Sequence, residues 1–353
     1  MKIAILGDAH FGARNDSPIF KKYFAKFYEN VFFPRLKAEG ITEVIQLGDF
    51  FDRRKYINFT TLDFIRKTFI NPAKEQGLNI EHLLGNHDIY YKNTLSINAS
   101  SQLTEHYKHF NVIDKPITLN YDGVKIDIVP WMCEENKQEI MDYIAVSDSD
   151  ILCAHLELNG YDMYPGIPAH GGISDNIFAK YHTVFTGHYH TRSVNGNINY
   201  IGTPYEITWG DAHDMKGFAI FDTETKTYEF VENPYRLHHK IMYDDSKENY
   251  DTMDLSHLEE TFIKIIVDTK DSIEMFDRFI DRLYQECKPH SIQITDLNLV
   301  IEDNDDLVDS IHTESPLSIL MNAVTVPNTS DEHETKKLIN IIYDEALKAG
   351  VAE

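Results

Sequence analysis

The chain has 353 residues, of which 42% are hydrophobic, and a formal net charge of −24 at pH 7. It contains no run of 18 or more apolar residues and no amino-terminal signal pattern, so we expect neither a membrane span nor secretion, and a cytoplasmic location. Three cysteines without C-x-x-C spacing disfavour a disulfide framework or a structural zinc site, and we expect them to be buried.

The negative charge is unevenly distributed. Residues 1–100 contain 14 Lys+Arg and 11 Asp+Glu, whereas residues 241–353 contain 9 and 26. Because a nucleic-acid backbone is bound chiefly through lysine and arginine, the net charge alone disfavours nucleic acid. The acidity lies away from the amino-terminal part, however, so binding of a phosphate-containing substrate there is not excluded.

Apolar runs between Met1 and His190 each end in a short polar string. Such runs predict buried strands whose carboxyl ends open into loops. The predicted strands cover residues 2–6, 41–47, 80–84, 151–153 and 184–186. The polar strings that follow them are Asp8-Ala9-His10, Gly48-Asp49-Phe50-Phe51-Asp52, Gly85-Asn86-His87-Asp88, Ala154-His155 and Gly187-His188-Tyr189-His190.

In open α/β sheets, ligands collect at the carboxyl ends of strands, so these loops can converge on one crevice. Carboxylates, imidazoles and an amide oxygen form a mixed oxygen and nitrogen donor set, which favours manganese, iron or zinc over calcium or magnesium cages. Two metals about 3.5–4 Å apart can activate a hydroxide and neutralise a phosphoryl group. Asp49, after the second strand, is the natural bridging ligand.

The ordered strings resemble the calcineurin-like metallophosphoesterase superfamily, from Met1 to roughly Tyr235. The resemblance implies an α/β fold, in which β-sheets are sandwiched by helices, and two Mn²⁺ ions, with Mg²⁺ or another divalent metal as the alternative. One metal is implied at Asp8, His10, Asp49 and His190, and the other at Asp49, Asn86, His155 and His188.

His87 has no ligand role in this assignment, and we interpret it as the general acid that protonates the leaving oxygen. Asp88 follows it and either orients the imidazole or caps the loop. Asp52 is either a carboxylate that supports a metal ligand or a turn residue. Four basic residues close to the first two strings are candidate contacts to a phosphate-containing substrate, with a solvated surface as the alternative: Arg14, Arg53, Arg54 and Lys55.

Later segments identify a branch of the superfamily. Tyr200–Tyr205, Trp209–Asp211 and Lys216–Asp222 resemble the SbcD-type nuclease subunit of double-strand-break repair complexes, and Val129–Asn136 resembles the small subunit of the tailed-phage recombination endonucleases. The resemblance implies exonuclease and endonuclease action on double-stranded ends and single-stranded regions of DNA. The alternatives are a phosphatase, a cyclic-nucleotide phosphodiesterase of the same superfamily, or an inactive scaffold.

We expect a nuclease domain at residues 1–240, an α+β DNA-capping domain at 241–300, and an acidic linker with helices at 301–353. The capping domain is predicted to contain a strand at 261–267, a helix at 272–288 and a strand at 291–294. Resemblance implies that the terminal helices bind an SbcC-type ATPase subunit, with packing on their own core as the alternative. It also implies a homodimer within a heterotetramer. Five aromatic residues could form that surface, but we favour core burial: Phe20, Tyr23, Phe24, Phe27 and Tyr28.

Overall fold

The computed structural model describes residues 1–164, 166–169 and 171–297. The chain divides into two compact units, Met1–His238 and His239–Glu353. The helices predicted within residues 301–353 lie outside the described residues. Within the described part, no helix is both long and apolar enough to cross a membrane.

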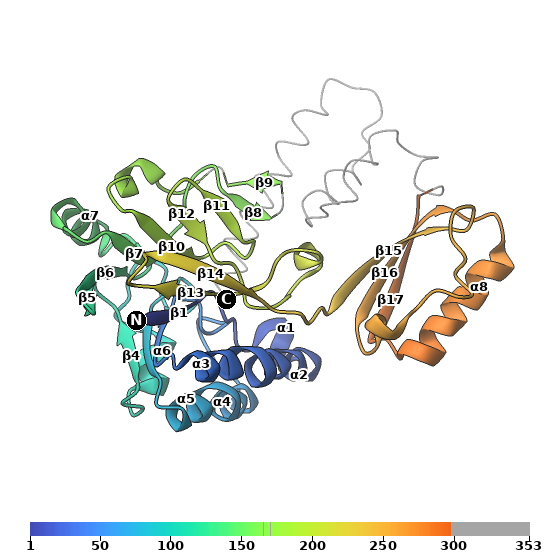
Figure 1. Cartoon of the computed structure of the whole chain (residues 1–353), viewed down its shortest axis with the longest axis horizontal. Helices are drawn as coiled ribbons and strands as arrows, with labels where there is room; N and C mark the ends of the chain where they lie inside the picture. Colours follow the sequence, from blue (N-terminus) through green and yellow to red (C-terminus); the bar gives the residue numbers. More distant parts are fainter. Residues whose placement is uncertain (165, 170, 298–353) are drawn as a thin grey trace, which may run out of the picture. The chain divides into compact units, whose positions relative to one another are not determined.

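The first unit contains two six-stranded sheets (Figure 1). In the first sheet, β1 to β4 run parallel, β13 pairs antiparallel with β1, and β14 pairs antiparallel with β13. The spatial order is β14 (Thr227–Glu232), β13 (Gly217–Asp222), β1 (Lys2–Leu6), β2 (Glu43–Gln46), β3 (Asn79–Leu83) and β4 (Phe110–Ile113).

The second sheet has a parallel centre with an antiparallel strand at each edge. Its spatial order is β11 (Ser193–Asn195), β12 (Ile198–Tyr200), β10 (Thr183–Gly187), β7 (Ile151–His155), β6 (Val124–Val129) and β5 (Ile117–Tyr121). A small two-stranded sheet, β8 (Asp162–Tyr164) with β9 (Ile167–Pro168), lies between β7 and β10 in the sequence.

The main hydrophobic cluster joins the two sheets. Ile5 and Ile45 of the first sheet share this cluster with Ile128, Cys153 and Phe185 of the second, and all five side chains are inaccessible to solvent. Both sheets contain parallel strands whose apolar side chains are covered on both faces, which explains the near-continuous apolar runs in the sequence. The fold is the α/β arrangement that we predicted.

Aromatic side chains of the helices near the amino terminus pack within the first unit. The Phe24 and Tyr205 rings are stacked with centroids 3.6 Å apart. The ring of Phe32 meets that of Phe218 in β13 edge-on, with centroids 5.0 Å apart. The five aromatic residues from Phe20 to Tyr28 are at most 5% exposed, which confirms core burial. The segments are α1 (Ala13–Asp16), α2 (Pro18–Phe27), π-helix Tyr28–Phe32, α3 (Phe33–Glu39), α4 (Phe59–Ile65), π-helix Arg66–Ile70 and α5 (Asn71–Glu75).

Further helices complete the first unit. Ile140 and Ile144 of α7 pack against Leu152 and Val184 of the second sheet. The remaining helical segments are α6 (Ala99–Thr104), α7 (Lys137–Val146) and the 3₁₀ turns Asp175–Phe178 and Trp209–Asp211.

In the second unit, a three-stranded sheet packs against one helix. The strand order is β15-β16-β17, and β16 and β17 are parallel. The Ser272 hydroxyl caps α8 by accepting a hydrogen bond from the Met275 N–H at 3.3 Å. The elements are β15 (His238–Asp244), the 3₁₀ turn Ser256–Leu258, β16 (Phe262–Thr269), α8 (Ile273–Arg282), π-helix Leu283–Cys287 and β17 (Ser291–Asp296). They match the predicted strand, helix and strand.

The three cysteines are free thiols and all are buried, as predicted: Cys133, Cys153 and Cys287.

Candidate metal centre

The polar strings meet at the carboxyl ends of five strands, β1, β2, β3, β7 and β10. Their ligand atoms form two groups, within each of which the atoms lie within 4.8 Å of one another. The first group is Asp8, His10 and His190, and the second group is Asp49, His155 and His188. Loops as far apart in the sequence as those of Asp8 and His190 therefore contribute to one buried cluster.

Asp49 lies between the two groups. Its Oδ2 is 3.5 Å from the Nε2 of His155 and 3.8 Å from the Nε2 of His10. The side chain is almost fully buried. This position fits a carboxylate that is shared by two cations.

Asn86 adjoins the second group. Its Oδ1 is 2.9 Å from the Nε2 of His155 and 2.8 Å from the Nδ1 of His188. The amide oxygen and the two imidazole nitrogens therefore converge, so all seven predicted ligands lie in the cluster.

Close approach of the backbone builds this cluster. A Cβ on Gly85 would lie 2.2 Å from the Asp49 Oδ1, and one on Gly187 would lie 2.3 Å from the Asp8 Oδ1. Three non-glycine residues of the cluster have left-handed backbone conformations: His10, Asp49 and His188, with φ of 43°, 49° and 92°. Such conformations cost free energy and persist at functional sites where the surrounding structure enforces them.

The Gln46 side chain links two of the loops and was missed by the sequence analysis. Its amide donates hydrogen bonds to the carbonyls of Gly7 and Gly48, at 3.0 and 2.7 Å, and its oxygen accepts from the Gly48 N–H at 3.1 Å. It is completely buried. The signal was a polar side chain within the stretch Val44-Ile45-Gln46-Leu47, two residues before Gly48.

Two histidines have partners that set their ring orientation. The Nδ1 of His155 is 2.7 Å from the Leu47 carbonyl, so this nitrogen donates. Nε2 then faces the Asp49 and Asn86 oxygens, where its lone pair would be available to a metal ion. The Nδ1 of His10 is 3.5 Å from the Asp52 carboxylate. At this distance the Asp52 carboxylate is an ion-pair neighbour of His10, whose Nδ1 has no hydrogen-bond partner among the described residues, so the role of Asp52 stays a prediction.

The donor set also fits a cation on electrostatic grounds. The Nε2 atoms of His10 and His190 face each other at 3.0 Å, and two imidazole lone pairs at this separation are satisfied by a shared proton or by a metal ion. Burial lowers the pKa of His190 to about 3, which keeps its ring neutral. Burial also raises the pKa of Asp8 to about 7, so an isolated carboxylate here is costly without a cation.

His87 lies beside the cluster but belongs to neither group. Its backbone N–H donates to the Asp49 Oδ1 at 2.6 Å. Its ring meets that of His10 edge-on, with centroids 5.0 Å apart. Its Nδ1 is 2.6 Å from the Asp52 carbonyl oxygen. Because a carbonyl can only accept, Nδ1 is the donor, and Nε2 is available for proton transfer.

The Asp88 carboxylate binds main-chain groups of two loops. Its two carboxylate oxygens accept hydrogen bonds from the N–H groups of Phe51 and Gly85, at 3.1 and 2.9 Å. The His87 ring is oriented by the Asp52 carbonyl instead, so the loop-capping alternative for Asp88 is the one that the structure favours.

The predicted DNA contacts differ in what they bind within the chain. Arg53 donates to Asp16 and Asn15, and Arg14 donates to the Ile207 carbonyl. Arg54 is half-buried, and its Nη1 has no hydrogen-bond partner among the described residues. Burial lowers the pKa of Arg54, opposed by the charge of Asp49. Lys55 is exposed.

A buried lysine next to His190 was also missed. The Nζ of Lys216 donates to the His190 carbonyl at 2.8 Å and pairs with Asp211 at 2.7 Å and Asp214 at 2.8 Å. Lys216 is fully buried, so its charge is compensated entirely within the protein. A lysine immediately before an apolar strand was the available signal.

Residues 1–209 match the family model of the calcineurin-like phosphoesterases. The chain belongs to this family, and thus to a class of enzymes that hydrolyse phosphoesters. It is 34% identical to exonuclease subunit 1 of Enterobacteria phage T4 over 351 residues, which cover 99% of this chain and 100% of that protein.

Two solved structures give weaker similarities. An archaeal phosphodiesterase has 16% identity and a TM-score of 0.33, with 66% of this chain and 100% of the other covered. A glutamine-dependent NAD⁺ synthetase from Acinetobacter baumannii has 8% identity and a TM-score of 0.27, with 91% of this chain and 69% of the other covered. The fold and site described above do not depend on either.

Proposed function

We propose that this protein is a metal-dependent DNA nuclease that hydrolyses phosphodiester bonds at the cluster described above. The observation on which this rests is the pair of ligand groups that meet at Asp49, with His87 beside them. Similarity along the full chain to a phage exonuclease subunit supports DNA as the substrate class.

Two Mn²⁺ ions fit the donor set. Asp8, His10, Asp49 and His190 would hold one ion, and Asp49, Asn86, His155 and His188 the other. When bound, such ions supply Lewis acidity to the phosphoryl group and activate water. The imidazole and amide donors favour Mn²⁺ over Mg²⁺, which prefers an all-oxygen shell.

His87 is the proposed general acid. Its Nδ1–H is fixed on the Asp52 carbonyl, so the transferable proton sits on Nε2 when the ring is charged. Burial lowers the pKa of His87, opposed by Asp49, and an arriving phosphodiester anion raises it again. As the P–O bond breaks, the departing sugar oxygen takes the Nε2 proton. Water supplies the new oxygen on phosphorus and releases a proton to solvent, from which the neutral His87 is protonated again.

Arg54 is the proposed contact to a backbone phosphate. The Arg54 guanidinium is half-buried next to a metal-ligand loop, and its Nη1 has no hydrogen-bond partner among the described residues, so the guanidinium can bind a phosphate oxygen. Arg53 and Arg14 are instead bound within the chain and hold the loops. Lys55 is retained as an exposed candidate contact.

The protein is proposed to act within a complex. The phage relative is named as a subunit, which supports a partner protein. We assign residues 301–353 to an SbcC-type ATPase subunit, residues 241–300 to a cap over the DNA, and the whole to a homodimer within a heterotetramer.

The substrate class can be tested with purified protein. We expect Mn²⁺-dependent degradation of linear double-stranded DNA and of single strands, abolished by EDTA. Turnover of para-nitrophenyl phosphate or its bis-ester, with DNA left intact, would instead identify a phosphatase or a small-molecule phosphodiesterase.

A further inference from the structure

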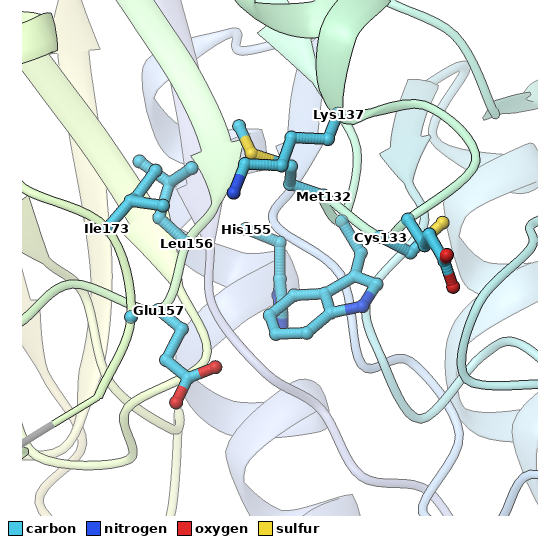
Figure 2. A pocket seen from close by; sticks show the side chains of 10 residues that line it. Met132, Cys133, Lys137, His155, Leu156, Glu157 and Ile173 are labelled. Atoms are coloured by element: carbon cyan, nitrogen blue, oxygen red, sulfur yellow. The ribbon is translucent and has the colours of Figure 1, made fainter.

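A pocket of about 370 Å³ opens beside the second ligand group, and His155 belongs to both (Figure 2). Three segments line it: the loop from β6 into α7, the end of β7, and residues 172–173. The side chains important for the argument are Trp131, Met132, Lys137, Leu156, Glu157 and Ile173.

We propose that this pocket binds one unpaired nucleobase, from a nucleotide that adjoins the phosphodiester held at the ligand groups. The proposal rests on the proposed nuclease function and assigns a second binding site for the same substrate. The pocket is within the volume range of sites for small organic ligands.

Trp131 supplies the stacking surface. Its ring centroid is 5.7 Å from that of His155 and 5.1 Å from that of His188. A nucleotide whose phosphate reaches the second group therefore has its base within reach of the indole. Stacking on an aromatic ring accepts every base, which suits a nuclease without sequence preference.

The rest of the lining fits a neutral base better than a phosphate. Met132, Leu156 and Ile173 provide apolar contacts, and the polarizable thioether of methionine packs well on aromatic rings. The charged groups are Lys137, Glu134 and Glu157, one cation and two carboxylates, so a phosphate anion is disfavoured. Donors and acceptors on these groups can meet the polar edges of a base.

The wall of the pocket is held in place before any ligand arrives. The Asn136 side chain accepts from the Cys133 N–H at 2.8 Å and donates to the Trp131 carbonyl at 3.0 Å. The backbone N–H of Trp131 donates to the Leu84 carbonyl at 2.7 Å, just after the strand that leads to Asn86. Such preorganisation lowers the entropy cost of binding.

The test uses single-stranded oligonucleotides in which one nucleotide is replaced by an abasic tetrahydrofuran analogue, placed on either side of the measured phosphodiester. When the analogue replaces the base proposed to occupy the pocket, wild-type cleavage should slow roughly tenfold or more, the size of one lost stacking contact. Trp131→Ala should cleave the intact strand as slowly as wild type cleaves the abasic strand, and should cleave the abasic strand no more slowly than that.

Ile173→Trp is a second variant, because a larger side chain at this lining position fills the pocket. It should slow the intact strand and leave the abasic strand at its wild-type rate. Mn²⁺ affinity, measured by calorimetry, should be unchanged in both variants, and Trp209→Ala, the other tryptophan, should keep the wild-type discrimination.

Equal slowing of intact and abasic strands by both variants, or no effect of the abasic nucleotide on either side, would overturn the pocket assignment. A failure of the nuclease function itself looks different, because wild-type protein with Mn²⁺ would then cleave neither strand.

Discussion

At the scale of single residues, the chemistry depends on histidines in which one of the two ring nitrogens has a partner within the protein. The Leu47 carbonyl holds His155, the Asp52 carbonyl holds His87, and the Asp52 carboxylate forms an ion pair with His10. In His155 and His10, the other ring nitrogen faces another member of the cluster. The roles of these histidines therefore follow from which nitrogen is occupied.

His87 gives the first prediction at this scale. His87→Ala should lower kcat for DNA cleavage by about 10²–10⁴-fold, because the leaving oxygen loses its proton donor. Mn²⁺ stoichiometry should not change, since His87 belongs to neither ligand group. His106→Ala, at an exposed histidine, is the matched control. Full turnover by His87→Ala with metal bound would exclude the acid role.

Asp88 gives a second prediction, which separates a structural role from a catalytic one. Asp88→Ala leaves the N–H groups of Phe51 and Gly85 without acceptors, and each unsatisfied group costs about 1–3 kcal/mol. Urea unfolding of metal-free protein should detect this loss, whereas Asp114→Ala, at an exposed position, should be neutral. Reduced kcat at unchanged stability would restore the orienting role.

At the scale of elements, the strands before the motifs could be predicted, because both faces of a parallel strand are covered and its sequence is continuously apolar. The edge strands β5, β11 and β14 were not predicted. Their half-exposed residues give weaker patterns, and the pairing of β14 through β13 with β1 joins the two ends of the first unit's sequence. Local sequence contains no information on such pairing.

The same limit applies to the candidate site. The ligands could be predicted from motif order, because each string is local. Gln46 and Lys216 could not, because their roles depend on carbonyls and carboxylates brought together only by the fold. Asp88 was assigned to its sequence neighbour, whereas its partners come from two different loops.

Lys216 provides a prediction for the segment after β12. Lys216→Met leaves Asp211 and Asp214 buried without their cation, and should cost about 3–5 kcal/mol in the free energy of unfolding. Lys226→Met breaks an exposed pair with Asp150 and should cost about 0–1 kcal/mol. Chemical denaturation of both variants checks this, and equal losses would contradict the buried role.

The pair of Asp211 and Lys216 also predicts that the stability of the protein depends on pH. Burial alone would raise the pKa of Asp211, but Lys216 holds it well below the ordinary value of 3.8. A depressed carboxylate pKa adds stability above the unfolded-state pKa, and this stability is lost as pH falls through the folded value. Wild-type protein should therefore lose more stability than Lys216→Met between pH 5 and about pH 2.

At the scale of the whole molecule, the net negative charge of the chain is compatible with a phosphate-containing substrate. The acidity is greatest in residues 241–353, and the ligand cluster would receive cations that offset its own carboxylates. The candidate site residues all belong to the first unit, whereas the segment proposed to bind the partner belongs to the second.

Deleting residues 315–353 tests that separation. The shortened protein should keep Mn²⁺-dependent cleavage, because every described ligand lies within the first unit. It should no longer retain an SbcC-type ATPase subunit in a pull-down. Retention of the subunit would place the binding surface elsewhere in the chain.

The most direct test of the account is to measure Mn²⁺ binding and cleavage of linear double-stranded DNA by wild type and Asp49→Ala, with folding checked by thermal unfolding. Because Asp49 lies between the two groups, its removal should weaken both ions and abolish cleavage while the fold remains. Two ions bound at wild-type affinity, with DNA still degraded, would contradict a shared carboxylate and the two-metal site built on it.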